Sequence, residues 1–193
     1  DIVVERSVGT PGAEPWADSI TGQSPHAWGR AMGWFSMAIV DALDFIPEDQ
    51  PGRGDMITIL QGMVEALSKI QDPKTGGWYQ VLDCSGDPGN YVETSCTAMF
   101  TYSILKGVRK GYLDRGYLST AKKAYNGLLD NFITVDSEGL VTMTGICGVA
   151  GLGGDPYRDG SYEYYIGEAT RNNDPKGVGP FIMASLEYER LTE

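Results

Sequence analysis

The chain has 193 residues, of which 41% are hydrophobic and 21% are charged, a composition typical of one folded domain rather than of a disordered segment. Its formal net charge of −11 argues against binding to nucleic acid or to an anionic membrane surface, because both need a basic face. An anionic small ligand stays compatible with this charge, since one or two arginines can dominate the potential of a pocket. We expect neither a membrane span nor a signal peptide.

The three cysteines, Cys84, Cys96 and Cys147, are odd in number, and their spacing fits no zinc or Cys-x-x-Cys motif. We expect reduced, partly buried thiols, which fit a reducing compartment, and therefore a cytoplasmic location. We expect no metal and no cofactor. The chain begins at Asp1 without an initial methionine, which we interpret as processing or truncation of a longer chain.

The predicted elements follow from apolar residues spaced three and four apart and from the turn residues between them. Residues 1–25 are rich in Gly, Pro and Ser and predict an extended lead-in. Helices are predicted over residues 28–45, 55–71, 92–110, 118–132 and 176–191. Other predicted segments are a short strand or extended loop over 78–82, a two-stranded ribbon over 133–146 that turns at 137–139, and a long glycine-rich loop over 148–174. No domain boundary is evident, so residues 1–193 form a single region.

A short pattern occurs three times, with a small residue three positions after a phenylalanine. The pairs are Phe35 and Ala38, Phe100 and Ser103, and Phe181 and Ala184. At helix spacing, each copy has one narrow face of small and apolar residues, which lets helices pack closely. Repeats with long, unequal periods indicate a toroid of helical hairpins with its chemistry on the loops at one end. Helices starting near 28, 92 and 176 would line the inside, and those starting near 55 and 118 would face solvent on one side.

The densest group of candidate site residues lies at the start of the first predicted helix. Trp28 and Arg30 fall in its first turn, where free amides and the helix dipole attract anions. The arginine fork can hold a carboxylate at two points, and the rings of Trp28 and Trp34 suit the C–H surfaces of a sugar. The alternative is structural: Trp34 is part of the core, and Arg30 pairs with an internal Asp or Glu.

Two further candidates flank the helix starts. His26 is the only histidine and is able to act as an acid, a base or a donor near neutral pH, but it also fits a helix cap or a surface group. Glu93 follows Tyr91 at the start of the predicted 92–110 helix. Its carboxylate either accepts sugar hydroxyls or complements the helix dipole as a cap.

The longest irregular region contains a tyrosine-rich segment, residues 157–165, which includes Arg158 and Tyr164. Long ordered loops are usually functional in compact domains, so this segment is either a polar clamp or a loop that packs over the toroid end. Lys176 offers a third cationic contact. Residues 148–154 lack both the Walker lysine and a G-x-G-x-x-G match, which excludes a phosphate-binding loop.

Four segments resemble glycoside hydrolase family 105, the unsaturated rhamnogalacturonyl hydrolases, which are relatives of the unsaturated glucuronyl hydrolases. They are SPHAWGRAMGW at 24–34, YVETSCTAMF at 91–100, DPYRDGSYEYY at 155–165 and DPKGVGPF at 174–181. The resemblance runs from about Asp18 to Leu191. It implies an all-α fold, the (α/α)6 barrel, and a part in pectin or rhamnogalacturonan degradation.

The family chemistry implied by the resemblance removes a 4,5-unsaturated uronic acid from the non-reducing end of an oligosaccharide. An acid protonates the double bond, water adds at the neighbouring carbon, and the hemiketal opens to release the leaving sugar, with no metal or cofactor. Trp28, Arg30 and Trp34 match the W-x-R-x-x-x-W segment of the sugar pocket, and Arg158 matches an arginine that contacts the substrate carboxylate. We expect the remaining substrate-binding residues to be His26, Tyr91, Glu93, Tyr164 and Lys176.

The chain also departs from the family pattern. Family members are about twice as long, and their catalytic aspartate precedes the W-x-R-x-x-x-W segment, where Asp1 and Asp18 do not match it. We therefore expect the C-terminal half of a barrel that lacks the catalytic acid, is inactive alone, and either self-associates or needs a missing N-terminal half. Two alternatives stay open: a paired-carboxylate glycosidase that uses Glu93 with Asp159 or Glu163, and a non-catalytic sugar-binding domain.

Overall fold

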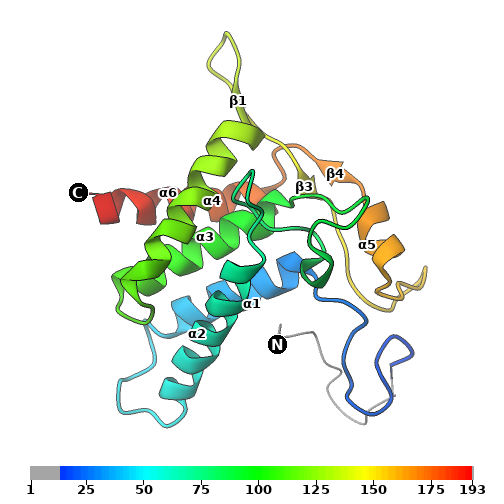
Figure 1. Ribbon diagram of the computed structural model, residues 1–193, viewed down its shortest axis with the longest axis horizontal. Coiled ribbons are helices and arrows are strands. Elements are labelled where there is room, and N and C mark those ends of the chain that lie inside the picture. The colour runs from blue at the N-terminus through cyan, green and yellow to red at the C-terminus, as the bar shows by residue number, and fades with distance from the viewer. Residues whose placement is uncertain (1–13, 193) are drawn as a thin grey trace.

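A computed structural model describes residues 14–192 of the chain (Figure 1). Its longer helices are α1 (Gly29–Ala42), α2 (Arg53–Lys69), α3 (Thr94–Arg109), α4 (Leu118–Phe132) and α6 (Pro175–Thr192). These five helices are the five that the sequence predicts, and the all-α class is confirmed. The first helix ends at Ala42 rather than near Phe45, because the chain there leaves the helix through tight turns in which Phe45 N donates to the Ala42 carbonyl.

Helix α3 lies at the centre of the fold. All its residues from Thr94 to Val108 are buried, and it packs against α1, α4 and α6. The outer helices are amphipathic, and each buries a single face. The buried residues are Leu60, Met63, Val64 and Leu67 on α2, and Ala121, Ala124, Gly127 and Leu128 on α4. The arrangement is the predicted alternation of inner helices, α1, α3 and α6, with the outer helices α2 and α4.

Small residues set the close packing of α1 on α3. A Cβ atom added to Gly33 would lie 2.9 Å from the Met99 Cβ atom, so a larger residue would push the two helices apart. The Ser36 and Ser103 hydroxyls hydrogen-bond across the same contact at 2.9 Å. The repeated phenylalanines behave differently, because Phe100 is fully buried on the central helix whereas Phe35 is 41% exposed on α1. Helix α1 packs against α3 along one face, and apolar side chains on another of its faces, including Phe35, are exposed.

The short strands form two antiparallel pairs. Strand β1 (Ile133–Val135) pairs with β2 (Val141–Met143), which confirms the predicted ribbon, and its turn contains Gly139 at φ 83°. Strand β3 (Ile146–Cys147) pairs with β4 (Thr170–Arg171). The predicted loop over 148–174 therefore contains β4 and also the one-turn helix α5 (Tyr162–Gly167). In Figure 1, α5, β3 and β4 lie together at the right, while α6 ends at the left.

The predicted extended lead-in is corrected for residues 14–25, which form a series of turns; residues 1–13 lie outside the described residues. The Asp18 carboxylate accepts hydrogen bonds from the backbone amides of Ile20 and Thr21, at 3.0 and 2.7 Å, and so closes a turn. Gly22 then donates back to the Asp18 carbonyl and adopts a φ of 73°. An aspartate that bonds its own following backbone competes with extended structure.

None of the helices in the described part of the chain has the length and apolar character needed to cross a membrane. The three cysteines are free thiols: Cys96 and Cys147 are buried, and Cys84 is partly exposed. The predicted partial burial of the cysteines is therefore confirmed.

Candidate functional site

The N-terminal ends of the three inner helices meet at one end of the fold. Arg30 lies in the first turn of α1, Glu93 is the N-cap residue of α3, and Asp174 directly precedes α6. The start of α6 packs on strand β3, because a Cβ added to Gly177 would lie 2.7 Å from Ile146 Cδ1, and Arg30 donates to the Cys147 carbonyl of the same strand. The β3–β4 pair and the loop that follows β3 cover this end, so most of the predicted site residues are brought together here.

Arg30 is enclosed in this neighbourhood, with 1% of its surface exposed. Its Nε donates to Ser95 Oγ at 2.8 Å, and its Nη2 donates to Glu93 Oε1 at 3.3 Å and to the Cys147 carbonyl. The guanidinium thus makes its hydrogen bonds inside the protein. This is the structural alternative that the sequence left open, in which Arg30 pairs with an internal carboxylate. A ligand carboxylate would reach Arg30 only if these contacts opened.

Glu93 is completely buried and caps α3. Its carboxylate accepts from the amides of Ser95 and Cys96, at 3.2 and 2.7 Å, and from the Cys147 amide at 2.9 Å. Glu93 is therefore the N-cap of α3, which is the second of the two roles that the sequence left open. A carboxylate whose oxygens are all occupied and shielded from water is badly placed for general acid–base work.

Trp28 is the N-cap residue just before α1, and Trp34 lies on α1. The Trp28 ring stacks on Tyr165 with 6.1 Å between centroids and an interplanar angle of 22°, and its Nε1 donates to Gln80 Oε1 at 3.1 Å. The Arg30 Cζ lies 5.6 Å from the centre of the Trp28 ring, a cation–π contact. Trp34 is 46% exposed, so it is not a core residue, and its ring is open to a ligand or to a partner.

The tyrosine-rich segment carries Arg158 and Tyr164 toward the same end. Arg158 Nε donates to the Gly153 carbonyl at 2.8 Å, and the Tyr164 hydroxyl accepts from the Gly151 amide at 3.1 Å. Burial, and after it the hydrogen bond with Glu168, raises the pKa of Tyr164 to about 12. Tyr164 also packs on Tyr165, the partner of Trp28 in the stack. These contacts join the predicted clamp to the start of α1.

Arg158 is one of two arginines at this end that have no carboxylate in ion-pair distance within residues 14–192. The other is Arg171 on β4, which is exposed. Lys176, by contrast, has its Nζ 2.8 Å from Asp174 Oδ1. Although burial of Asp174 opposes the effect, hydrogen bonding from Lys176 lowers the pKa of that carboxyl. Arg158 is therefore the better candidate for a ligand anion.

His26 and Tyr91 complete the predicted set. His26 Nδ1 lies 2.7 Å from Asp83 Oδ2, and the two side chains are 24% and 33% exposed. Tyr91 is partly buried, and burial, followed by the neighbouring Cys147 thiol, raises the pKa of its hydroxyl. The Tyr91 hydroxyl thus keeps its proton at neutral pH and is not a general base. His26 is a surface group held by a partner 57 residues away in sequence.

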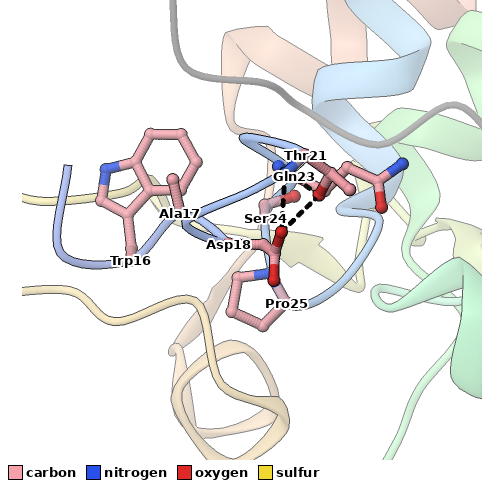
Figure 2. A pocket seen from close by; sticks show the side chains of 7 residues that line it. All are labelled: Trp16, Ala17, Asp18, Thr21, Gln23, Ser24 and Pro25. Carbon is pink, nitrogen blue, oxygen red and sulfur yellow. Dashed lines mark hydrogen bonds between the residues drawn. The ribbon is translucent and has the colours of Figure 1, made fainter. Parts of the chain in front are cut away.

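A cavity of about 440 Å³ opens beside this end, in the segment that precedes α1 (Figure 2). Its lining is aromatic and polar and consists of Trp16, Ala17, Asp18, Thr21, Gln23, Ser24 and Pro25. Sequence analysis missed this cavity, although a tryptophan close to several hydroxyl and amide side chains was a usable signal. The cavity lies against the tyrosine-rich segment, because a Cβ on Gly160 would be 3.3 Å from Cδ of Pro25, which lines the cavity.

The exposed carboxylates here are unsuited to donating a proton. The hydrogen bonds that Thr21 and Ile20 donate lower the pKa of Asp18, and those from Ser161 lower the pKa of Asp159. A general acid that works near neutral pH needs the opposite shift. The arrangement can therefore bind a polar ring on tryptophan faces and an anion on Arg158, but these two aspartates are poor acids.

Comparison with known proteins agrees with this architecture. The profile of Glycosyl Hydrolase Family 88 matches residues 6–192. Protein Atu3128 of Agrobacterium fabrum is 41% identical over 181 residues, which cover 89% of this chain and 76% of that protein. A solved family 105 glycoside hydrolase from C. acetobutylicum is 50% identical, with a TM-score of 0.89 over 92% of this chain and 49% of that one.

The unsaturated rhamnogalacturonyl hydrolase YesR of Bacillus subtilis is 30% identical over 117 residues, which cover 60% of this chain and 30% of that enzyme. The helical-hairpin fold is that of the α/α-barrel glycoside hydrolases. The chain belongs to the glycosyl hydrolase family 88 and 105 group. It spans about half the length of the solved family 105 enzyme.

Proposed function

We propose that the chain supplies the substrate-binding half of a hydrolase that acts on 4,5-unsaturated uronyl oligosaccharides, such as those left by cleavage of pectin or rhamnogalacturonan. Membership of a glycoside hydrolase family supports the hydrolase class. The name of the B. subtilis relative, an unsaturated rhamnogalacturonyl hydrolase, supports the substrate class. The free thiols Cys84, Cys96 and Cys147 support a reducing, cytoplasmic setting.

One observation carries the proposal: in a strongly acidic chain, the half-buried guanidinium of Arg158 has no carboxylate partner among residues 14–192. A formal net charge of −11 repels anions at long range, so an anionic sugar needs a local cation that is not already neutralised. Arg158 is half-buried, and its Nε donates to the Gly153 carbonyl. Two residues earlier in the same loop, the Gly151 amide donates to the Tyr164 hydroxyl. A planar guanidinium is the side chain best suited to hold a uronate carboxylate at two points.

The chemistry of the substrate assigns the other roles. Tryptophan rings pack against the C–H face of a sugar, for which Trp34 on α1 and Trp16 in the neighbouring cavity are available. Hydration begins when an acid donates a proton to one carbon of the double bond, and water then adds its hydroxyl to the neighbouring carbon. The resulting hemiketal opens to a ketone by breaking its bond to the ring oxygen, which takes up a proton and becomes a hemiacetal hydroxyl on the anomeric carbon. Collapse of this hemiacetal to an aldehyde breaks the glycosidic bond, and the hydroxyl proton passes to the leaving sugar.

We place the catalytic acid in the half of the barrel that this chain does not cover. Glu93 is buried and fully hydrogen-bonded, and the pKa of Asp159 is lowered, so the paired-carboxylate alternative has little support. The exposed flanks of the inner helices favour the same view. Trp34 and Phe35 on α1 are 46% and 41% exposed, and Ile182 and Leu186 on α6 are 55% and 48% exposed. Either a second copy or the other half of a barrel would cover these flanks.

The test separates binding from turnover. An unsaturated uronyl disaccharide is offered to the chain, its conjugated chromophore is followed by absorbance, and its binding is measured by calorimetry. We expect binding without loss of the chromophore, because general acid–base help normally contributes about 10²–10⁴-fold to the rate. Robust turnover by the chain alone would assign the acid to Glu163 or another residue of this half. Binding of neither the unsaturated nor a saturated uronide would contradict the proposal.

A further inference from the structure

Three donor atoms of different chemistry converge beside the start of α1, outside the network of Arg30 and Arg158. They are His26 Nδ1, from the segment before α1, and Asp83 Oδ2 and Cys84 Sγ, both from the short turn η1 (Leu82–Cys84). We propose that these three atoms bind a borderline divalent cation of the Zn²⁺ type, which fastens the segment before α1 to η1. Sequence spacing predicted no metal site, because the histidine is far from the other two residues in the chain.

The distances between the donor atoms fit such an ion. Cys84 Sγ lies 3.6 Å from His26 Nδ1 and 4.0 Å from Asp83 Oδ2, and the latter two atoms are 2.7 Å apart. Tetrahedral zinc with its usual bond lengths of about 2.0–2.3 Å places its ligand atoms about 3.3–3.7 Å from each other. The sulfur is thus nearly in position. Only the histidine and the aspartate must separate, by less than about 1 Å, as the ion replaces the proton that they share.

The donor set selects the class of cation. A thiolate with an imidazole suits Zn²⁺ or Co²⁺, whereas Mg²⁺ and Ca²⁺ prefer sites built from oxygen atoms alone. His26 and Asp83 are 24% and 33% exposed, so an ion and a completing water molecule have access from solvent. Asp87, on the loop that follows η1, adds negative charge near the thiol without being one of the three donors.

Hydrogen bonds behind the donors hold them in position. The Ala27 amide donates to Asp83 Oδ1 at 2.8 Å, which leaves Oδ2 free to face His26. The Asn90 side chain donates to the carbonyls of Val81 and Cys84, both at 2.8 Å, and so fixes the turn that carries the thiol. Support of this kind orients metal ligands in proteins, and its loss typically costs about 10–100-fold in affinity.

The experiment uses the reduced full chain, freed of metal with a chelator and titrated with Co²⁺. We expect one Co²⁺ per chain, an absorption band from thiolate-to-cobalt charge transfer, and displacement of the cobalt by Zn²⁺ but not by Mg²⁺. Bound Zn²⁺ should also protect Cys84 from a thiol reagent; the other two cysteines are buried and serve as internal references. This protection needs no substitution, so it tests the site even if a variant fails to fold.

Variants then assign the ligands. We expect at least about 10-fold weaker Co²⁺ binding in each of Cys84→Ser, His26→Gln and Asp83→Asn. Losing a metal ligand should cost at least as much affinity as losing one of its supporting hydrogen bonds. Asp87→Asn is the matched control, because it removes a nearby charge but no donor atom, and it should bind within about 2-fold of the parent chain. Absence of the thiolate band, or equal binding by Cys84→Ser and the parent, would overturn the proposal and leave only adventitious surface binding.

Discussion

Arg30 and Glu93 form an ion pair in which 2% and 0% of the two side chains are exposed, and this pair joins the first turn of α1 to the N-cap of α3. Both are charged groups in the first turn or cap of an inner helix. Their pairing means that the W-x-R-x-x-x-W segment is anchored inside the fold by its arginine. The tryptophans on either side of Arg30 are then held in fixed positions relative to α3.

The first prediction concerns stability rather than ligand binding. Arg30→Ala should lower the free energy of unfolding by about 3–5 kcal/mol, because it leaves the Glu93 carboxylate buried without its counter-charge. Arg30→Lys should cost less, since it keeps the charge but cannot contact Glu93, Ser95 and Cys147 together. Urea unfolding at neutral pH measures both effects.

A matched control for this prediction is Arg115→Ala, which removes an exposed arginine of the turn η2 (Arg115–Tyr117). It should change the free energy of unfolding by less than about 0.5 kcal/mol. If Arg30→Ala unfolds at the same urea concentration as this control, the Arg30–Glu93 pair does not hold the two helix starts together.

The second prediction concerns acid stability and Asp44. Its carboxylate lies 2.7 Å from the ammonium groups of both Lys106 and Lys110, and hydrogen bonds from these lysines lower the pKa of Asp44 from 3.8 to about 2. The lowered folded-state pKa stabilises the fold above the unfolded-state pKa, and this stabilisation is lost as the pH falls from about 4 to about 2. Because the site is partly exposed, Asp44→Asn should cost about 1 kcal/mol or less at pH 7.

Unfolding measured as a function of pH checks this prediction. The difference between the parent chain and Asp44→Asn should shrink as the pH approaches 2. Asp130→Asn is the control, since Asp130 is exposed on α4 and has no ion pair among residues 14–192. A difference that stays constant across this pH range would mean that Asp44 contributes through packing rather than through its charge.

The sequence predicted the helices well because their signals are local. Apolar spacing of three and four, together with terminators such as Pro47 and Gly111, places the five long helices within a few residues. The turns over 14–25 were missed because composition alone does not reveal that Asp18 bonds its own following amides. Helix α5 was missed because six residues are too few to show a period.

The candidate site was harder to predict because its contacts are long-range. The sequence left open whether Arg30 pairs inside the protein, and the answer depends on Glu93, which the fold brings next to it. The partner of His26 is Asp83, 57 residues away, and nothing in the spacing of the two residues connects them. The stack of Trp28 on Tyr165 joins the start of α1 to helix α5 and has no sequence signal either.

The third prediction concerns the exposed flanks of the inner helices. Trp34 on α1 and Ile182 on α6 are 46% and 55% exposed, and large exposed apolar surfaces promote association. We expect concentration-dependent self-association of the isolated chain in sedimentation velocity experiments. Trp34→Ser and Ile182→Ser should each reduce it, whereas Leu140→Ser, at the tip of the β1–β2 ribbon and 63% exposed, should not. A compact monomer at all concentrations would contradict this prediction.

The last prediction concerns Arg158 and the anionic ligand. Arg158→Ala should weaken binding of an unsaturated uronyl disaccharide by about 1.5–3 kcal/mol, the usual contribution of a hydrogen bond to a charged group, and Arg158→Lys should weaken it less. The methyl ester of the same disaccharide lacks the carboxylate charge, so its weaker binding should be nearly the same in parent and variant.

Calorimetry measures the binding of both ligands, and Arg115→Ala serves as the control for a changed net charge. Because Arg158 Nε donates to the Gly153 carbonyl at 2.8 Å, the stability of each variant must be measured alongside its binding. If Arg158→Ala is folded and binds the free acid as the parent does, the carboxylate is held elsewhere, and Lys176 becomes the residue to test.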